Sequence, residues 1–257
     1  MNNIGQRLKY FRTRQNISQM DVELAIEASF GSISRIESDK VNPTKETIEK
    51  IVQFLKLKDN EIDYLVGPSS MPTTIEECST AIISVSEYFK KQAVIAYLVD
   101  DRYRMLQMSS SLPKILRLSD SQYEEILGRT LIELILEKKY GIRQYFEKDF
   151  EFNLRLIISR FIYEMGFMVN DEFYKLQKNI IMSDPISRNI WDELVLNPQS
   201  SSYNYNGRLI HFHYYGLNLD LRYANEQLMG NKRFCMVEYL PSDNLTRLFT
   251  KFLGFAR

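Results

Sequence analysis

Cysteine is scarce in this chain. Only Cys78 and Cys235 occur among 257 residues, and they lie far apart. Small secreted domains that depend on disulfides carry many more cysteines, and zinc sites built from cysteine place them two residues apart. The shortage excludes a disulfide scaffold and favours a protein of the reducing cytoplasm.

Long apolar segments and an excess of one charge are also absent. No stretch approaches the roughly 20 apolar residues of a membrane-spanning helix, so we expect neither export nor membrane insertion. The 33 basic and 33 acidic residues give a formal net charge of zero. A surface that binds nucleic acid must therefore be local. Arg7, Lys9, Arg12 and Arg14 form such a basic stretch near the start, and a solvated helix face is the alternative.

The motifs of the common enzyme classes are missing. The sequence has no Walker-type phosphate loop, no nucleophile elbow, no HExxH and no kinase signature. It also lacks a haem attachment pattern and the reactive cysteine motif of flavin photosensors. We therefore expect no cofactor and no catalysis.

The chain has only two histidines, His211 and His213. Their spacing places them on one face of a strand, where Cys235 from a neighbouring strand would be a third metal ligand. Hydrogen-bonded structural histidines are the commoner outcome. We expect no metal.

What is present suits two domains. The length and the 44% hydrophobic content provide for two cores, and GPSSMPTT interrupts the helical pattern after residue 66. We predict a first domain at residues 1–67, a linker and connecting helix at 68–92, and a second domain at 93–257. The apolar positions of the connecting helix also suit pairing with a second copy: Ile75, Ile82, Val85 and Phe89.

Helical spacing and caps predict an all-α first domain. Ile4, Leu8 and Phe11 form the buried stripe of a first helix that exposes its arginines. Ser18 with Asp21 predicts the start of a second helix, and Thr44 that of a fourth. KDNEIDYLV, from Lys58, predicts a last helix.

The segment between these helices has the pattern of a turn and a third helix. Ala28 and Ser29 suit a turn and an N-cap, and Ile33 and Ile36 point inward. The outward positions are too small and polar for another core face, which suggests entry into a major groove: Phe30, Gly31, Ser32 and Arg35.

SQMDVELAIEASFGSISRIESDKVNPTKETIEKI resembles the Cro/repressor-type helix-turn-helix of the XRE family. The resemblance implies that Ser29 to Ser38 is the recognition helix. Glu23 and Glu27 depart from the family, which commonly has a small alanine and a turn glycine there. These departures question the local packing of the turn.

The resemblance implies DNA contacts for eight residues: Gln19, Ser29, Phe30, Gly31, Ser32, Arg35, Arg12 and Lys40. Arginine can donate two hydrogen bonds to guanine, so Arg35 is the main base contact, with an exposed ion pair as its alternative. Phe30 suits a thymine methyl group, and Ser32 specifies little. Arg12, Gln19 and Lys40 suit phosphates.

The second domain shows strand patterns around a helical middle. AVIAYLVDD and RYRMLQMSS predict a hairpin, and SSYNYN, RLIHFHYYGLNLDL and NKRFCMVEYLP predict later antiparallel strands. The hairpin, short helices and Gly128 resemble the opening of a PAS domain. With the inserted helices and the PISRNIW segment, the order resembles the MmyB-like ligand-binding domain. This predicts an α+β PAS-like domain with an antiparallel sheet and inserted helices.

The MmyB-like resemblance implies a small apolar ligand, of the fatty-acyl type. Seven residues suit the lining of its cavity, and ordinary core positions are the alternative for each: Tyr97, Met105, Phe161, Phe167, Trp191, Phe212 and Tyr214.

Together these observations predict a homodimeric, ligand-controlled transcription regulator that binds a palindromic operator. Two alternatives remain open at this point. The second domain only dimerises or docks a protein partner, or the chain is an enzyme fused to a DNA-binding domain.

Overall fold

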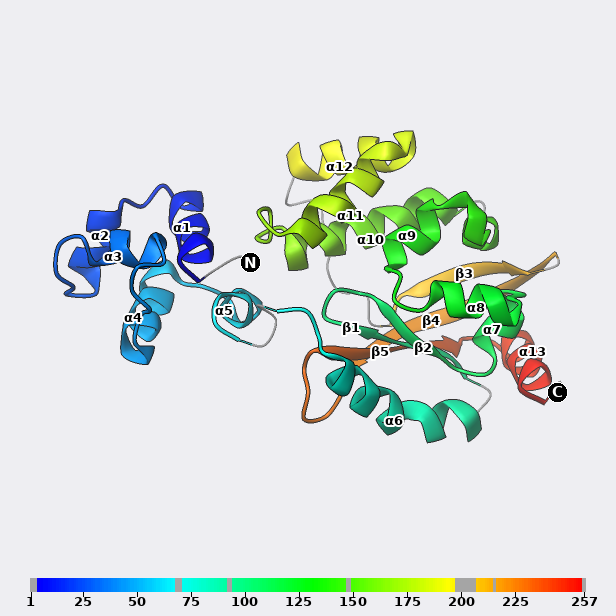
Figure 1. Ribbon diagram of the computed structural model, residues 1–257. Helices are drawn as coiled ribbons and strands as arrows, with labels where there is room; N and C mark the ends of the chain where they lie inside the picture. The colour runs from blue at the N-terminus through cyan, green and yellow to red at the C-terminus, as the bar shows by residue number, and fades with distance from the viewer. Residues whose placement is uncertain are drawn as a thin grey trace. The chain divides into compact units, whose positions relative to one another are not determined.

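The computed structural model describes residues 4–67, 71–91, 94–146, 149–196, 207–214 and 216–255 (Figure 1). The chain divides into two compact units. The first unit comprises Met1–Met71 with Glu164–Lys175, and the second comprises Pro72–Tyr163 with Leu176–Arg257.

The first unit contains five short helices between Ile4 and Leu65: α1 (Ile4–Arg14), α2 (Gln19–Ala25), α3 (Ser32–Glu37), α4 (Lys45–Leu55) and α5 (Asp59–Leu65). Its core is made of the apolar positions that helical spacing predicts. The fully buried side chains include Leu8, Phe11, Val22, Ile33, Ile51 and Leu55. Burial of this stripe, and not the propensity of such short helices, stabilises the unit.

Helix caps set the boundaries of α2 and α4 as predicted. The Ser18 hydroxyl accepts from the Asp21 amide, and the Asp21 carboxylate accepts in return from the Ser18 amide. At the start of α4, the Thr44 hydroxyl accepts from the Thr47 amide. The predicted cap of the third helix at Ser29 is wrong, because α3 begins after Gly31 and has no side-chain cap of its own.

Over its described residues, the second unit is built on a five-stranded antiparallel sheet. Its strands are β1 (Ile95–Asp100), β2 (Met105–Met108), β3 (Leu209–Tyr214), β4 (Leu217–Gln227) and β5 (Phe234–Pro241), in the order β2-β1-β5-β4-β3. The predicted hairpin of β1 and β2 is confirmed. Residues 201–206, where a further strand was predicted, lie outside the described residues.

The other described elements from residue 75 onward are helices, two of which extend into Glu164–Lys175, the segment that belongs to the first unit. They are α6 (Ile75–Lys91), α7 (Leu112–Ile115), α8 (Asp120–Ile126), α9 (Leu131–Leu136), two 3-10 turns (Lys138–Tyr140 and Ile142–Tyr145), α10 (Phe150–Met165), α11 (Glu172–Ser183), α12 (Pro185–Leu196) and α13 (Asn244–Phe255). Across the described ranges, no helix has both the length and the apolar character needed to cross a membrane.

The two faces of the sheet carry different layers. On one face, Val85 and Phe89 of α6 pack with Leu98 of β1 and Phe234 of β5. The opposite face carries alternate residues, including Tyr97, and Arg160 of α10 reaches it. Figure 1 shows α6 on one side of the sheet and α10 on the other. Val85 and Phe89 are therefore buried against the chain's own sheet and unavailable for the predicted pairing of α6 with a second copy.

Two features near the C-terminus differ from prediction. Residues 208–221 form two strands and not one, because Gly216 adopts a left-handed conformation (φ 79°) in the turn between β3 and β4. Helix α13 follows β5 and was not predicted. Its cap is a local signal, since the Asp243 carboxylate accepts from the Thr246 amide at 2.9 Å.

Candidate DNA interface

The exposed face of α3 is the candidate DNA interface. Ile33 and Ile36 are buried, and Phe30 is 87% exposed just before the helix begins. A single exposed apolar side chain is common on protein surfaces, so the position of Phe30 is compatible with a DNA contact without requiring one. Ser29, Ser34, Arg35, Ser38 and Lys40 are exposed as well.

Arg35 presents its guanidinium to solvent from the middle of this face. Its Nε donates to the Gly31 carbonyl oxygen at 3.3 Å. Within the described part of the chain, no carboxylate forms an ion pair with it. Among the described residues Arg35 does not form the exposed ion pair that was its alternative role, and its donors are available for a base edge.

Ser32 and Gly31 differ from the other predicted base contacts. The Ser32 hydroxyl is buried and has no hydrogen-bond partner among the described residues. Gly31 has a φ of 79°, and an added Cβ would meet no atom within 4 Å. Its backbone conformation, and not a lack of space, is thus what favours glycine here.

The predicted exposure of the arginines on α1 is wrong for Arg7 and Arg12, which are both 8% exposed. Arg7 donates to the carbonyl oxygens of Tyr64 and Leu65, at the C-terminal end of α5. This position suits a cation, because helix C-termini carry free carbonyls and partial negative charge.

Arg12 lies in a buried network behind α3. Its Nε and Nη2 donate to the two Glu37 carboxylate oxygens at 2.6 and 2.9 Å, and its Nη1 donates to the Ile17 carbonyl. Gln19 donates its amide to the same carboxylate at 2.6 Å. The network joins α1, α2 and α3, and phosphate contacts by Arg12 and Gln19 stay predictions.

Sequence reasoning missed Ser34 and Ser38 as members of the exposed face. Both follow Phe30 at intervals of four residues, which places them on one side of a helix. Their hydroxyls are short and polar, like that of Ser32. Helical spacing from Phe30 was the signal that would have found them.

The seven predicted ligand-lining residues do not gather in one place. Tyr97, Met105, Phe161, Trp191 and Phe212 are buried in the second unit, where the Phe161 and Trp191 rings are 6.2 Å apart. Phe212 instead stacks on Tyr145, and Tyr214 lies against Phe249. Phe167 belongs to the first unit, 5.9 Å from the Phe11 ring.

The histidines are held by neighbours across the β3–β4 hairpin. His211 Nδ1 is 2.7 Å from the Asp220 carboxylate, and His213 Nδ1 is 2.6 Å from the Asn218 side-chain oxygen. Strand β4 lies between them and Cys235, whose register places it on the opposite sheet face. Among the described residues, no group of three potential ligands could hold a metal.

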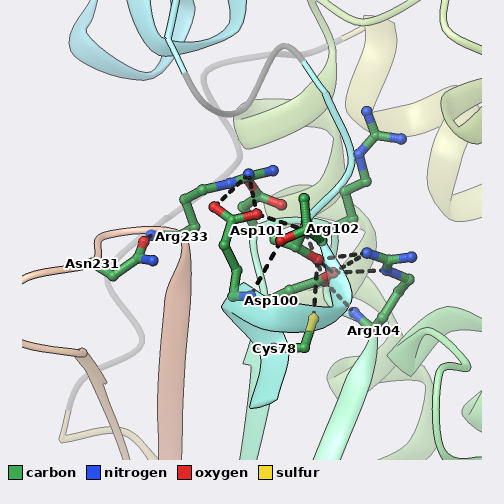
Figure 2. Close-up of polar contacts among 10 residues, drawn as sticks. Cys78, Asp100, Asp101, Arg102, Arg104, Asn231 and Arg233 are labelled. Carbon is green, nitrogen blue, oxygen red and sulfur yellow. Dashed lines mark hydrogen bonds and ion pairs between the residues drawn. The ribbon is translucent and has the colours of Figure 1, made fainter. Parts of the chain in front are cut away.

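A charged cluster lies where the β1–β2 turn meets the start of α6 (Figure 2). We call it the turn cluster: Glu77, Asp100, Asp101, Arg104 and Arg233. Arg233 Nε donates to Asp101 at 2.7 Å, and its Nη1 donates to Glu77 at 3.1 Å. Asp100, whose side chain is fully buried, accepts from Arg104 Nε at 2.7 Å. Asp100 ends β1, and Asp101 begins the turn to β2.

The comparison with known families agrees with the geometry of the first unit. No curated protein matches the chain. Residues 8–62 match the family model described as Helix-turn-helix, of the XRE type. The match spans most of the region from α1 to α5, which includes the exposed face of α3. These residues are a DNA-binding helix-turn-helix, and the chain has the DNA-binding part of a transcription regulator.

Proposed function

We propose that the chain is a sequence-specific transcription regulator that reads DNA with α3. The observation that carries this proposal is that Phe30 and Arg35 are both exposed at α3, and that no carboxylate in the described structure pairs with Arg35. Arg35 donates to a guanine edge, and Phe30 contacts a thymine methyl group. Ser29, Gly31 and Ser32 lie at the same end of α3. Lys40 and Gln19 orient the domain on phosphates, and Arg12, which is buried, acts through its bonds to Glu37.

The test begins with selection of a preferred duplex from random sequence by the full chain. Arg35→Ala should weaken binding to that duplex by about 1–3 kcal/mol and relax the preference at one base pair. Lys45→Ala is the matched control, because it removes an exposed positive charge from α4. An unchanged preference in the Arg35 variant contradicts base reading by α3.

We further propose that two copies act together on a palindromic operator. Helix α3 has six residues, so one copy reads few base pairs, and a pair reads half-sites about one helical turn apart. Light scattering of the full chain, alone and with the selected duplex, should give the mass of two copies. A monomer in both conditions contradicts the proposal.

For the second unit we propose control by an elongated apolar ligand with a carboxylate head, such as a fatty acid. Support comes from the sheet face that α10 covers, which carries the buried side chains of Tyr97, Met105 and Tyr223. Arg160 donates to the Tyr223 hydroxyl at 2.8 Å and lies 4.5 Å above the Tyr103 ring. Tyr97 and Tyr239 share a hydrogen bond beside it. Few convergent polar groups in an apolar layer are typical of ligand sites.

The ligand proposal predicts a dependence on both ends of the ligand. Affinity should rise severalfold with each added methylene, and free acids should bind more tightly than their methyl esters. Arg160→Gln should remove the preference for the acid. Arg155→Gln is the control, since Arg155 lies on the same helix in a surface ion pair with Glu193.

Two results would replace this proposal with the alternatives. The absence of saturable acyl binding would leave dimerisation or docking of a protein as the function of the second unit. Turnover of a bound compound would favour an enzyme. Operator affinity measured with and without ligand tests control itself, because a ligand shifts only states that it binds unequally.

A further inference from the structure

Helix α3 begins without a cap from its own sequence. Its N-cap residue is Gly31, in a left-handed conformation and with no side chain to accept from the first amides. Ile33 is fully buried, and the N-cap residue has no side chain that could accept a hydrogen bond from the Ile33 amide. A buried amide without an acceptor is strongly unfavourable, so another part of the fold must supply one.

Glu23 of α2 supplies that acceptor. Its Oε1 accepts from the Ile33 amide at 2.9 Å, across ten residues of sequence. The side chain is buried, and within the described residues it forms no ion pair. The negative charge is therefore balanced by the amide and by the positive end of the helix. The XRE pattern commonly has a small alanine here, which cannot reach α3.

We infer that Glu23 is a positioning residue for DNA recognition. Its carboxylate fixes the first turn of α3 to α2, and it thereby sets where Phe30 and Arg35 point. The inference rests on the proposed function of α3. A helix of six residues has few other constraints on its N-terminal turn, since only Ile33 and Ile36 anchor it in the core by apolar contact.

Two variants separate the acceptor from the bulk of the side chain. Glu23→Gln keeps an oxygen acceptor of the same shape, and Glu23→Ala removes it. Glu49→Ala is the control, because it removes an exposed carboxylate of the same unit from α4. In the full chain, amide exchange at Ile33 should accelerate about tenfold or more in Glu23→Ala and stay near the native rate in Glu23→Gln.

DNA binding provides the second measurement. Glu23→Ala should lose about tenfold in affinity for the duplex selected by the unmodified protein, with an unchanged salt dependence, because phosphate contacts remain. Glu23→Gln should recover most of this loss, and Glu49→Ala should bind as the native chain does.

Each outcome decides the inference. Native exchange at Ile33 in Glu23→Ala overturns the cap, and fast exchange with native operator affinity overturns the positioning role. Fast exchange in Glu23→Gln shows that the oxygen acceptor is not what holds α3. If Glu23→Ala unfolds the whole unit, amides of α1 and α4 also exchange fast, and Glu23→Gln then decides. If the unmodified chain selects no duplex, the proposed function itself fails.

Discussion

Both units of the chain bury an arginine against carboxylates, but they do so in different surroundings. In the first unit, Arg12 and Glu37 pair through two hydrogen bonds, and their side chains are only 9% and 3% exposed. In the second, Arg233 is 6% exposed, whereas its partners Asp101 and Glu77 are 15% and 30% exposed. Water can therefore solvate Glu77, and Asp101 to a smaller extent, but not Glu37.

The two arrangements also connect different things. Arg12 joins residues within one small helical unit, and Gln19 completes the coordination of the same carboxylate. Arg233 divides its donors between a hairpin turn and the first turn of α6, which is 156 residues away in sequence. We conclude that the buried Arg12–Glu37 pair is a fixed part of the core of the small helical unit. The more exposed ion pairs of Arg233 tie distant segments of the sheet unit together.

The largest predicted effect concerns the buried Arg12–Glu37 pair. Arg12→Met leaves the Glu37 charge buried beside Gln19 alone and should destabilise the first unit by about 3–5 kcal/mol. Hydrogen exchange of the full chain should show fast amides from α1 to α5 and protected amides in β1 and β5.

The double variant Arg12→Met with Glu37→Met is the control, because apolar replacement of both partners removes the stranded charge. It should recover most of the loss. Trp191 is the only tryptophan and lies in the second unit, so its fluorescence transition in urea should stay native in both variants. A loss below 1 kcal/mol in the single variant would mean that water reaches Glu37.

The second effect should be smaller and confined to the other unit. Arg233→Ala removes donors from Glu77 and from the less exposed Asp101, so we expect a loss of about 1.5–3 kcal/mol in the Trp191 transition. Arg233→Lys, which keeps the charge but cannot bond both acids with a planar fork, should fall between. If Arg233→Ala destabilised the second unit by more than Arg12→Met destabilises the first unit, the comparison would be reversed.

The first unit was largely predictable because its signals are local. The caps at Ser18 and Thr44 and the stripe of Leu8 and Phe11 each depend on residues within one turn or two. The burial of Arg12 depends on Glu37, 25 residues away, and no local pattern reports it. For the same reason the sequence predicted Glu23 only as a departure, and its contact with Ile33 required the fold.

In the second unit the strand patterns were local, but their arrangement was not. The hairpin of β1 and β2 follows from alternation around the Asp100 turn. The order β2-β1-β5-β4-β3 joins strands that are more than 130 residues apart, so Cys235 could not be separated from His211 and His213 beforehand. Packing also decides which aromatic residues meet, which is why Phe212 pairs with Tyr145 and not with Trp191.

A third prediction compares two left-handed residues in the turn before α3. Glu27 has a φ of 55° and Gly31 a φ of 79°. The left-handed region costs a residue with a Cβ about 1–2 kcal/mol. Glycine avoids this cost, but part of the gain is lost because glycine has more conformational entropy in the unfolded chain. Glu27→Gly should therefore stabilise the first unit by about 0.5–1 kcal/mol, and Gly31→Ala should destabilise it by a similar amount.

Hydrogen exchange of the α4 amides, recorded as the temperature is raised, reports the thermal unfolding of the first unit and measures both changes in stability. Glu27→Ala is the control, because it removes the carboxylate and keeps the Cβ, and it should leave stability near the native value. A stabilising Glu27→Ala would show that charge repulsion, and not the backbone, limits this turn.

The smallest effect concerns the two acids that share Arg233, whose pKa values shift in opposite directions. Burial raises the pKa of Asp101 above its ordinary 3.8, and this outweighs the bond to Arg233. The pKa of Glu77 is lowered from 4.5, chiefly by the Thr74 amide and also by Arg233. Compared with the unfolded chain, the folded state therefore shifts Asp101 towards its protonated form and Glu77 towards its charged form.

The signs of the pH effects follow from proton linkage. The stabilising contribution of Asp101 is present below its unfolded pKa and is lost as pH rises through its folded pKa. That of Glu77 is present above its unfolded pKa and is lost as pH falls through its folded pKa. As pH falls from 7 towards 4, the stability of the native second unit should thus rise relative to Asp101→Asn and fall relative to Glu77→Gln.

Urea titration of Trp191 fluorescence at several pH values measures both differences, and other titrating groups cancel because each variant shares them. Parallel slopes for the two variants would mean that Asp101 is as well solvated as Glu77, and the distinction between a buried and a wetter partner within the turn cluster would then be lost.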